Sequence, residues 1–357
     1  MKLKRITVVL ILSWLIFQAG AQPVRNELLV PDIDGYHTLK CDFHIHTVFS
    51  DGDVWPLTRV SEAWREGLDA IAITDHLEYN PHKKYIPISH EAPYEIAKES
   101  AQQAGIILIK GTEITKSMPP GHFNALFIDQ ATPVHNDDYK QALREAKAQG
   151  AFILWNHPGW KAQAPDGPKW MDEHQELFDE KLFHGIEVAN YNEWYPEVLD
   201  WAGDKNLTIF SNSDIHEPMS DYLLQNKTDR RPITLVFSRE RTSESIHEAL
   251  LAGRTAGWFR EYLFAREEIL NQLLEESIDV SITGRNEKNI TYKIRNLTDL
   301  VFNMHFPVAG SDKFLPGRSS ILITLPAKEN HDQVTFGNLL SRSGKPVVAQ
   351  LSSLMKP

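Results

Sequence analysis

The segment CDFHIHTVFSDG (residues 41–52) carries histidines and aspartates at a spacing that suits metal binding. On an extended strand, residues two apart project from the same face, so His44 and His46 point toward one place, and Asp51 follows in the next loop. Two imidazoles that share one target indicate a bound cation. The alternative is that both histidines form hydrogen bonds in the core or lie in solvent.

Further acids and histidines occur where apolar runs end. They are Asp75 and His76 after AIAIT, Glu113 after IILIK, His157 after AFILW, and Asp214 and His216 after LTIFS, whereas His122 begins a run. In α/β barrels and open α/β sheets, functional sites are assembled at the carboxyl ends of the strands. Imidazole and carboxylate ligands without thiolates favour reactive zinc, manganese or iron over a structural zinc site. We expect Asp75 to orient a ligand rather than to bind metal.

The elements that position these residues alternate between short apolar runs and amphipathic segments from about residue 39 to 260. The apolar runs are LKCDF, AIAIT, IILIK, FNALFI, AFILW, GIEVA, LTIFS and ITLVF, and the helix-like segments are 54–67, 91–104, 136–149, 194–205 and 243–252. Short apolar strands separated by helices are typical of parallel α/β architecture, and their number favours a barrel over an open sheet. After residue 275, alternating apolar and polar residues between turns predict a small all-β domain, most simply a sandwich.

The first 21 residues have the pattern of a secretory leader. Lys2, Lys4 and Arg5 precede the apolar run ITVVLILSWLIF, and the small residues AGA end at Ala21. We therefore expect export to the periplasm or the medium, with a mature chain that starts near residue 22; an uncleaved anchor is the alternative. The apolar run is shorter than the roughly 20 residues of a membrane span, and no later stretch is long enough, so no span is expected after leader removal.

Charge and cysteine content limit the partners and the means of stabilisation. The net charge of −11 becomes −14 without the three leader cations, which makes a nucleic-acid polymer an unsuitable partner. A small phosphorylated substrate remains suitable, because its charge can be met locally. Cys41 is the only cysteine, so no intrachain disulfide can form and the core must hold the fold.

Taken together, the motifs HIHTVFSDG, ITDH, GTE with the following GHF, NHP and SDIH resemble the polymerase and histidinol phosphatase (PHP) superfamily. They occur in the family's order over about residues 40–217. The resemblance implies a distorted (β/α)7 barrel that holds two or three divalent ions of zinc, manganese or iron. We expect a signal peptide over 1–21, the PHP barrel with its terminal helix over 22–274, and a C-terminal β domain over 275–357 that the resemblance does not cover.

The resemblance also implies the metal ligands, residue by residue. One ion is held by His44, His46, Glu113 and Asp214, a second by Glu113, His122 and His157, and a third by Asp51, His76 and His216. A carboxylate such as Glu113 can serve two neighbouring metals. We expect Glu113, His157 and Asp214 to be essential for catalysis.

The implied activity is hydrolysis of phosphate esters by a hydroxide that bridges two ions. Bridging metals lower the pKa of bound water to near 7 and clamp the phosphoryl oxygens. We favour small organic phosphodiesters as substrates, because the loop at 156–172 is large and an exported enzyme meets organic phosphate to be scavenged. Lys161 in that loop and Arg254 after the helix-like segment 243–252 are the candidate substrate-binding cations.

Three other functions compete with this one. A phosphomonoesterase acting on a sugar, nucleotide or histidinol-type phosphate would use the same ligands. A noncatalytic PHP-like binding or scaffold module is the alternative of another class, although no ligand position is missing here. Hydrolysis of a carbon–nitrogen bond by an amidohydrolase-type barrel is disfavoured, because Lys110 is the nearest candidate for a metal-bridging lysine and is more simply an ordinary strand residue.

Overall fold

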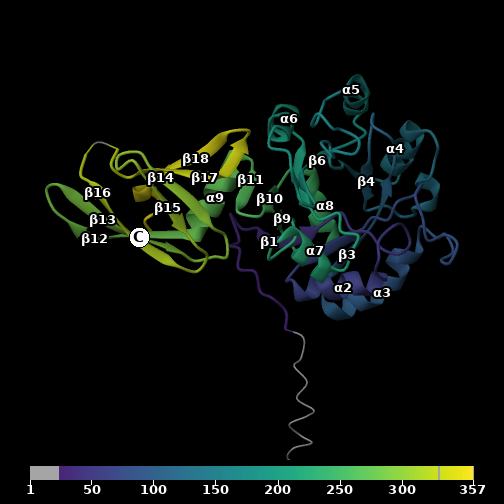
Figure 1. Cartoon of the computed structure of the whole chain (residues 1–357), viewed down its shortest axis with the longest axis horizontal. Coiled ribbons are helices and arrows are strands. Elements are labelled where there is room, and N and C mark those ends of the chain that lie inside the picture. The colour runs from purple at the N-terminus through teal and green to yellow at the C-terminus, as the bar shows by residue number, and fades with distance from the viewer. Residues whose placement is uncertain (1–23, 329, 357) are drawn as a thin grey trace, which may run out of the picture.

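The protein has two lobes, an α/β barrel and a smaller β domain, which lie side by side in Figure 1. The computed structural model describes residues 24–328 and 330–356, so the predicted leader over 1–21 lies outside the described residues. None of the helices within the described ranges has the length and apolar character needed to cross a membrane. The predicted fold class, an α/β barrel followed by a β domain, is confirmed.

The strands of the barrel form one continuous curved sheet. They are β1 (His37–Asp42), β2 (Ala70–Ile73), β3 (Ile107–Ile114), β4 (Phe123–Leu126), β5 (Phe152–Trp155), β6 (Gly185–Asn190), β8 (Thr208–Asn212), β9 (Ile233–Ser238) and β10 (Thr255–Phe259). The sheet order β10-β9-β1-β2-β3-β4-β5-β6 continues to β8. Side chains complete the closure, because Thr234 Oγ1 accepts from Ser211 N–H at 3.0 Å and Thr255 Oγ1 donates to Ile209 O at 2.8 Å.

Antiparallel strands distort this barrel. β4 runs antiparallel to both β3 and β5, and β9 runs antiparallel to both β1 and β10. The loop from β3 to β4 is too short for the crossover helix that a parallel connection needs, so this pair forms a hairpin. The all-parallel pattern inferred from the apolar runs therefore fails at these two strands.

Helices cover the outside of the barrel. They are α2 (Pro56–Arg65), α3 (Ala92–Ala104), α4 (Tyr139–Ala148), α5 (Asp172–Asp179), α6 (Val198–Lys205), α7 (Met219–Asn226) and α8 (Ser243–Leu251), with a 3-10 turn η1 (Thr132–Val134). Local chemistry sets several starts: Pro56 is the first residue of α2, and Asp138 and Thr242 cap α4 and α8 by accepting backbone N–H groups. Helices α5 and α7 were not predicted, because each is only two turns long and has no extended apolar period.

The C-terminal lobe is a β sandwich. One sheet consists of β12 (Ile278–Arg285), β13 (Asn289–Asn296) and β16 (Ser320–Pro326), and the facing strands are β14 (Phe302–Phe306), β15 (Ser311–Leu315), β17 (Gln333–Arg342) and β18 (Lys345–Gln350). Strand β13 buries Ile290, Tyr292 and Ile294 while the residues between them are more exposed, which is the predicted period-two pattern. A 3-10 turn, η2 (Leu351–Leu354), follows β18.

Backbone pairing joins the two lobes. Strand β11 (Tyr262–Ala265) and the connecting helix α9 (Glu267–Ser277) follow β10. The short strand β7 (Glu193–Trp194) lies at the other edge of the sheet, next to β6. Strand β11 pairs in parallel with β17, so that Leu263 lies opposite Leu339 and Phe264 opposite Leu340. The barrel sheet thus continues into the sandwich, a connection that the sequence did not indicate (Figure 1).

Candidate metal centre

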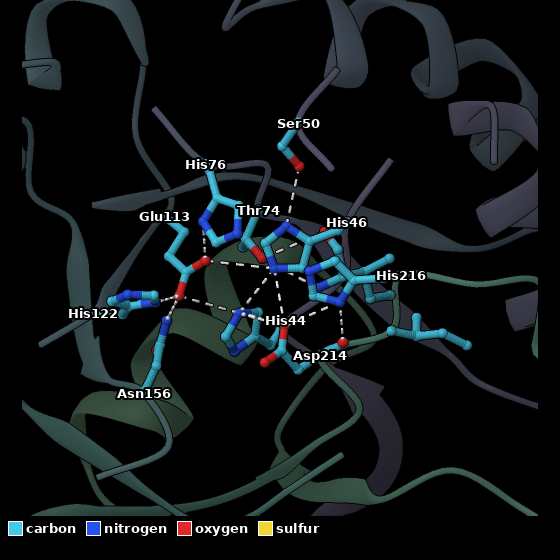
Figure 2. A network of polar contacts seen from close by, with 12 residues as sticks. His44, His46, Ser50, Thr74, His76, Glu113, His122, Asn156, Asp214 and His216 are labelled. Carbon is cyan, nitrogen blue, oxygen red and sulfur yellow. Dashed lines mark hydrogen bonds and ion pairs between the residues drawn. The ribbon is translucent and has the colours of Figure 1, made fainter. Parts of the chain in front are cut away.

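Two ligand-bearing segments lie side by side at the carboxyl end of the barrel. Ile45 and Ile215 form a parallel bridge, and the flanking backbone hydrogen bonds run from His46 N–H to Ile215 O and from Asp214 N–H to His44 O. The side chains consequently converge, with His44 Nε2 and His46 Nε2 3.1 Å apart. Asp214 Oδ1 lies 3.1 Å from the first nitrogen and 2.9 Å from the second (Figure 2).

Glu113, near the end of β3, is the central carboxylate of the cluster. Its Oε1 lies 3.1 Å from His122 Nδ1 and 3.4 Å from His44 Nε2. Its Oε2 lies 2.6 Å from His76 Nδ1 and 3.4 Å from His46 Nε2 (Figure 2). The side chain is fully buried. Because its two oxygens face imidazoles from different strands, Glu113 is positioned to bridge two ions.

Asp51 gathers a second group of histidines. Its Oδ1 lies 3.2 Å from His216 Nε2 and 3.4 Å from His76 Nε2. The ring of His46 stacks on that of His216, with 4.2 Å between the centroids. His46 therefore connects the histidines around Asp51 to the cluster formed by His44, Asp214 and Glu113.

The structure brings all the predicted metal ligands into overlapping groups whose donor atoms lie within 4.8 Å of one another. The groups are His46, Asp51, His76 and His216; His44, His157 and Asp214; His44, His46 and Glu113; and His76, Glu113 and His122. The three ligands predicted for the third ion, Asp51, His76 and His216, form one of these groups together with His46. The division of the other ligands between two separate ions stays a prediction.

Two of the ligands have strained backbones. His157 has a φ of 27° and Asp214 a φ of 49°, in the left-handed region that non-glycine residues rarely adopt. Strain of this kind persists where surrounding contacts over-determine the conformation, and it clusters at functional sites. Both side chains face the other predicted ligands, with His157 Nε2 3.5 Å from Glu113 Oε1 and Asp214 Oδ1 2.9 Å from His46 Nε2.

Opposite charges stabilise each other within the cluster. Burial opposes ionisation of Glu113, but the neighbouring histidines His76, His44 and His122 lower its pKa well below the usual range. Burial also disfavours protonated His44, yet Asp214 and Glu113 raise its pKa well above the usual range. For His46, burial and the adjacent His216 and His76 lower the pKa to about 3. The carboxylates therefore stay anionic while His46 keeps a free lone pair at neutral pH.

The donor set fits divalent metal ions. Asp51 Oδ1, Glu113 Oε2 and Asp214 Oδ1 are buried oxygens that make no hydrogen bond. Their contacts are with imidazole nitrogens, which are themselves metal-binding atoms, so a cation between the two kinds of atom would satisfy both. Imidazole nitrogens and carboxylate oxygens without thiolates suit zinc, manganese or iron.

Glu187 on β6 supports these ligands and was missed in the sequence analysis. Its Oε1 accepts from Asn212 Nδ2 at 2.9 Å and lies 3.0 Å from His44 Nδ1. Its Oε2 accepts the backbone N–H of His157 at 2.7 Å and Asn190 Nδ2 at 2.8 Å. A carboxylate behind a ligating histidine fixes its tautomer and ring orientation. The signal that could have revealed it is an acid inside the apolar run GIEVAN, since buried acids are rare unless paired.

Arg59 on α2 was also missed in the sequence analysis. It donates hydrogen bonds to both backbone segments that carry predicted ligands, the one around His46 and the one at 215–217. Its guanidinium donates to the carbonyl oxygens of His46, Ile215, His216 and Glu217 at 2.7–3.1 Å. A buried arginine on the inner face of a helix gives no indication in the sequence that its partners are backbone carbonyls.

Asp75 and Asn156 orient ligands. Asp75 accepts from Thr47 N–H and from Ser50 Oγ, each at 2.6 Å, and Ser50 Oγ lies 3.2 Å from His46 Nδ1 (Figure 2). Asn156 Nδ2 donates to Glu113 Oε1 at 2.8 Å. Both therefore act through a ligand rather than as one.

The cluster forms the floor of a cavity of about 350 Å³. The residues around this cavity are Asp51, His76, His122, His157, Trp160, Asn190, Tyr191, Asn192, Glu193, Asp214, His216 and Glu217. A second cavity of about 420 Å³ adjoins it, because Asn192 and Glu193 line both. A small molecule can thus enter the cavity over the cluster, and the second cavity provides further space beyond Asn192 and Glu193.

The two predicted substrate-binding cations are placed differently. Lys161 lines the adjoining cavity. Arg254 lines neither cavity: its guanidinium pairs with Glu248, donates to Phe237 O at 3.0 Å and lies over the ring of Tyr36. Arg254 is therefore not brought to the metal centre, because it sits before β10 at the opposite end of the strands from the ligands.

Known proteins similar to this chain cover both lobes. The PHP domain model matches residues 42–285. A two-domain protein from Bacteroides vulgatus, whose crystal structure contains a predicted PHP-like metal-dependent phosphoesterase, is 44% identical with a TM-score of 0.88. The match covers 93% of this chain and 99% of that chain. An uncharacterized protein of Methanocaldococcus jannaschii is 40% identical over 191 residues, which is 50% of this chain and 83% of that protein.

Proposed function

This chain belongs to the PHP domain family, and from that premise we propose that it is a metal-dependent phosphoesterase acting on small organic phosphodiesters. The observation that carries the proposal is the buried group of imidazoles and carboxylates at the floor of an open cavity. Three of its buried carboxylate oxygens, Asp51 Oδ1, Glu113 Oε2 and Asp214 Oδ1, form no hydrogen bond and face imidazole nitrogens, as the ligands of a shared cation would. The Bacteroides vulgatus relative, which contains a predicted metal-dependent phosphoesterase, supports the same reaction class.

The roles of the chain's own residues follow from their contacts. Glu113 and Asp214 bring negative charge among the histidines, which would lower the repulsion between divalent ions held there. Glu187 and Asn156 fix the orientations of His44 and Glu113. Divalent zinc, manganese or iron bound there would supply the chemistry, since such ions lower the pKa of a water and neutralise phosphoryl oxygens.

The adjoining cavity favours a diester over a monoester. A phosphodiester carries two organic substituents, and the two cavities share the wall formed by Asn192 and Glu193. One substituent fits beside the metal centre, and the other reaches toward Lys161 and Trp194. A monoester would leave the second cavity unused. We further propose, from the leader pattern, that the reaction takes place outside the cytoplasm.

The test is hydrolysis of bis(p-nitrophenyl) phosphate and p-nitrophenyl phosphate by purified protein loaded with zinc, manganese or iron. We expect faster release of p-nitrophenol from the diester, abolished by Asp214→Asn but unaffected by Glu99→Gln, which changes an exposed acid on α3. Elemental analysis should find at least two metal ions per chain. A faster monoester reaction would identify a phosphatase instead, and metal binding without hydrolysis of either ester would identify a noncatalytic module.

A further inference from the structure

The part of the cavity wall that is not formed by the predicted metal ligands includes anionic and aromatic side chains. It contains the carboxylates of Glu193 and Glu217 and the rings of Trp160 and Tyr191. Among the described residues that line this cavity, none is lysine or arginine. A phosphoesterase that relied on protein cations to hold its substrate would have the opposite charge here, so this wall indicates something about the organic part of the ester.

Both glutamates are held in place by tyrosines rather than by cations. Tyr191 Oη donates to Glu217 Oε1 at 2.5 Å, and Tyr195 Oη donates to Glu193 Oε2. Burial and then Glu217 raise the pKa of Tyr191 to about 12, and burial and then Glu193 raise the pKa of Tyr195. The phenols thus stay protonated donors, and each contacts only one of the two carboxylate oxygens of its glutamate.

These glutamates are not committed to the metal site. Neither Glu193 nor Glu217 belongs to any of the metal-binding groups. Within residues 24–328 and 330–356, the side-chain partners of these two carboxylates are tyrosines and not lysines or arginines. Their negative charge therefore stays available after the metal ligands are filled.

The aromatic side chains provide an independent indication of the same ligand. Trp160 is 39% exposed although its ring packs against two metal ligands, at 5.7 Å from the ring of His122 and 5.4 Å from that of His157. An exposed indole and carboxylates that line one cavity can together bind an ammonium group, through cation–π attraction and direct charge pairing. Tyr191 adds a second ring to the same cavity.

We infer that the ester hydrolysed at this site carries an ammonium group on the substituent that faces Trp160, Glu193 and Glu217. The phosphoryl group would lie over the metal ligands, and the ammonium group would lie between the indole and the two carboxylates. This inference rests on the proposed phosphoesterase function and specifies its substrate class as esters of amino alcohols. Esters with anionic substituents, such as those of nucleotides, are excluded by the same wall.

The experiment compares two chromogenic diesters that differ only in charge: p-nitrophenyl phosphorylcholine and p-nitrophenyl 3,3-dimethylbutyl phosphate, in which carbon replaces the quaternary nitrogen. We expect kcat/KM to be at least about tenfold higher for the cationic ester. In Glu217→Gln and Glu193→Gln this ratio should fall toward one, whereas it should be unchanged in Glu99→Gln. Choline should also inhibit hydrolysis of bis(p-nitrophenyl) phosphate more strongly than 3,3-dimethylbutanol does.

The outcomes separate this inference from the function on which it rests. Equal kcat/KM for the two esters, a preference for the neutral one, or a preference for a neutral glyceryl p-nitrophenyl phosphate overturns the ammonium inference and leaves the phosphoesterase function standing. A ratio that stays high in both glutamate variants also overturns it. If no phosphate ester is hydrolysed by the metal-loaded protein, the proposed function itself fails.

Discussion

Replacing Glu187 with Gln should weaken metal binding although Glu187 is not itself a ligand. The buried carboxylate accepts from four directions, with His44 and Asn212 on one oxygen and the His157 N–H and Asn190 on the other. Glutamine has the same shape but turns one of these acceptors into a donor. Whichever way the amide lies, one pair of donors loses its acceptor and one ligand-bearing residue is released.

The size of the effect follows from these contacts. Loss of the partner behind a ligating histidine typically lowers metal affinity 10- to 100-fold, which corresponds to about 1.4–2.7 kcal/mol. Hydrogen bonds to a buried charge contribute about 1.5–3 kcal/mol, so the two ways of estimating the loss agree. We therefore expect metal affinity in Glu187→Gln to fall by one to two orders of magnitude.

The assay is competition for zinc between the protein and a chromogenic chelator, with Glu99→Gln as the matched control on the surface of α3. Urea unfolding of the metal-free variant tests whether the loss merely reflects a damaged fold. Metal affinity within twofold of the wild type, in a protein that unfolds at the normal urea concentration, would refute the role assigned to Glu187.

Three further predictions concern the ligands, the support beneath them and a histidine away from the site. Glu113→Gln and His157→Ala should lower both metal content and kcat/KM on the best ester by more than 10³-fold, whereas Arg254→Ala should have little effect on either; the reverse ranking would contradict the metal mechanism. Arg59→Lys should lower the free energy of unfolding by roughly 2–4 kcal/mol in urea titrations, because the lysine cannot reproduce the forked donation to backbone carbonyls. Burial, and then the nearby Lys147 and His247, lower the pKa of His184 in the folded protein to about 4. The pKa of a histidine in the unfolded chain is about 6.5, so as the pH falls below 6.5 the unfolded chain is protonated before the folded one. About 3 kcal/mol of stability should then be lost between pH 6.5 and 4, and urea titrations of His184→Gln should show a smaller loss.

The sequence was sufficient to predict that the candidate ligands converge, because their positions follow from strand ends. His44, His76, Glu113 and Asp214 each come directly after or at the end of a buried strand, and parallel strands bring such ends together. The alternation after residue 275 likewise predicted the sandwich. These features depend on local period and composition, which a single sequence displays.

What the sequence could not show depends on partners that are distant along the chain. Arg59 donates to backbone carbonyls, which every residue has, so the sequence does not reveal its partners. Arg254 directly precedes β10, so its distance from the metal centre depends on the direction in which β10 runs through the sheet. The antiparallel direction of β9 is likewise set by its pairing with β1 rather than by its own residues. The anionic wall arises because Glu193 on β7 and Glu217 in the loop after β8, which are distant in the sequence, line one cavity.

The pairing of β11 with β17 has a consequence for how the newly made chain matures. During synthesis β11 is complete long before Leu339 emerges near the C-terminus, so an edge of the barrel sheet stays open until the last part of the chain appears. Closing a connection of this length carries an entropic cost and makes the final pairing a late step. An open strand edge is a template for association with other chains. A product that ends before β17 would therefore keep all its metal ligands and yet expose that edge, so the C-terminal lobe ties solubility of the enzyme to completion of its translation.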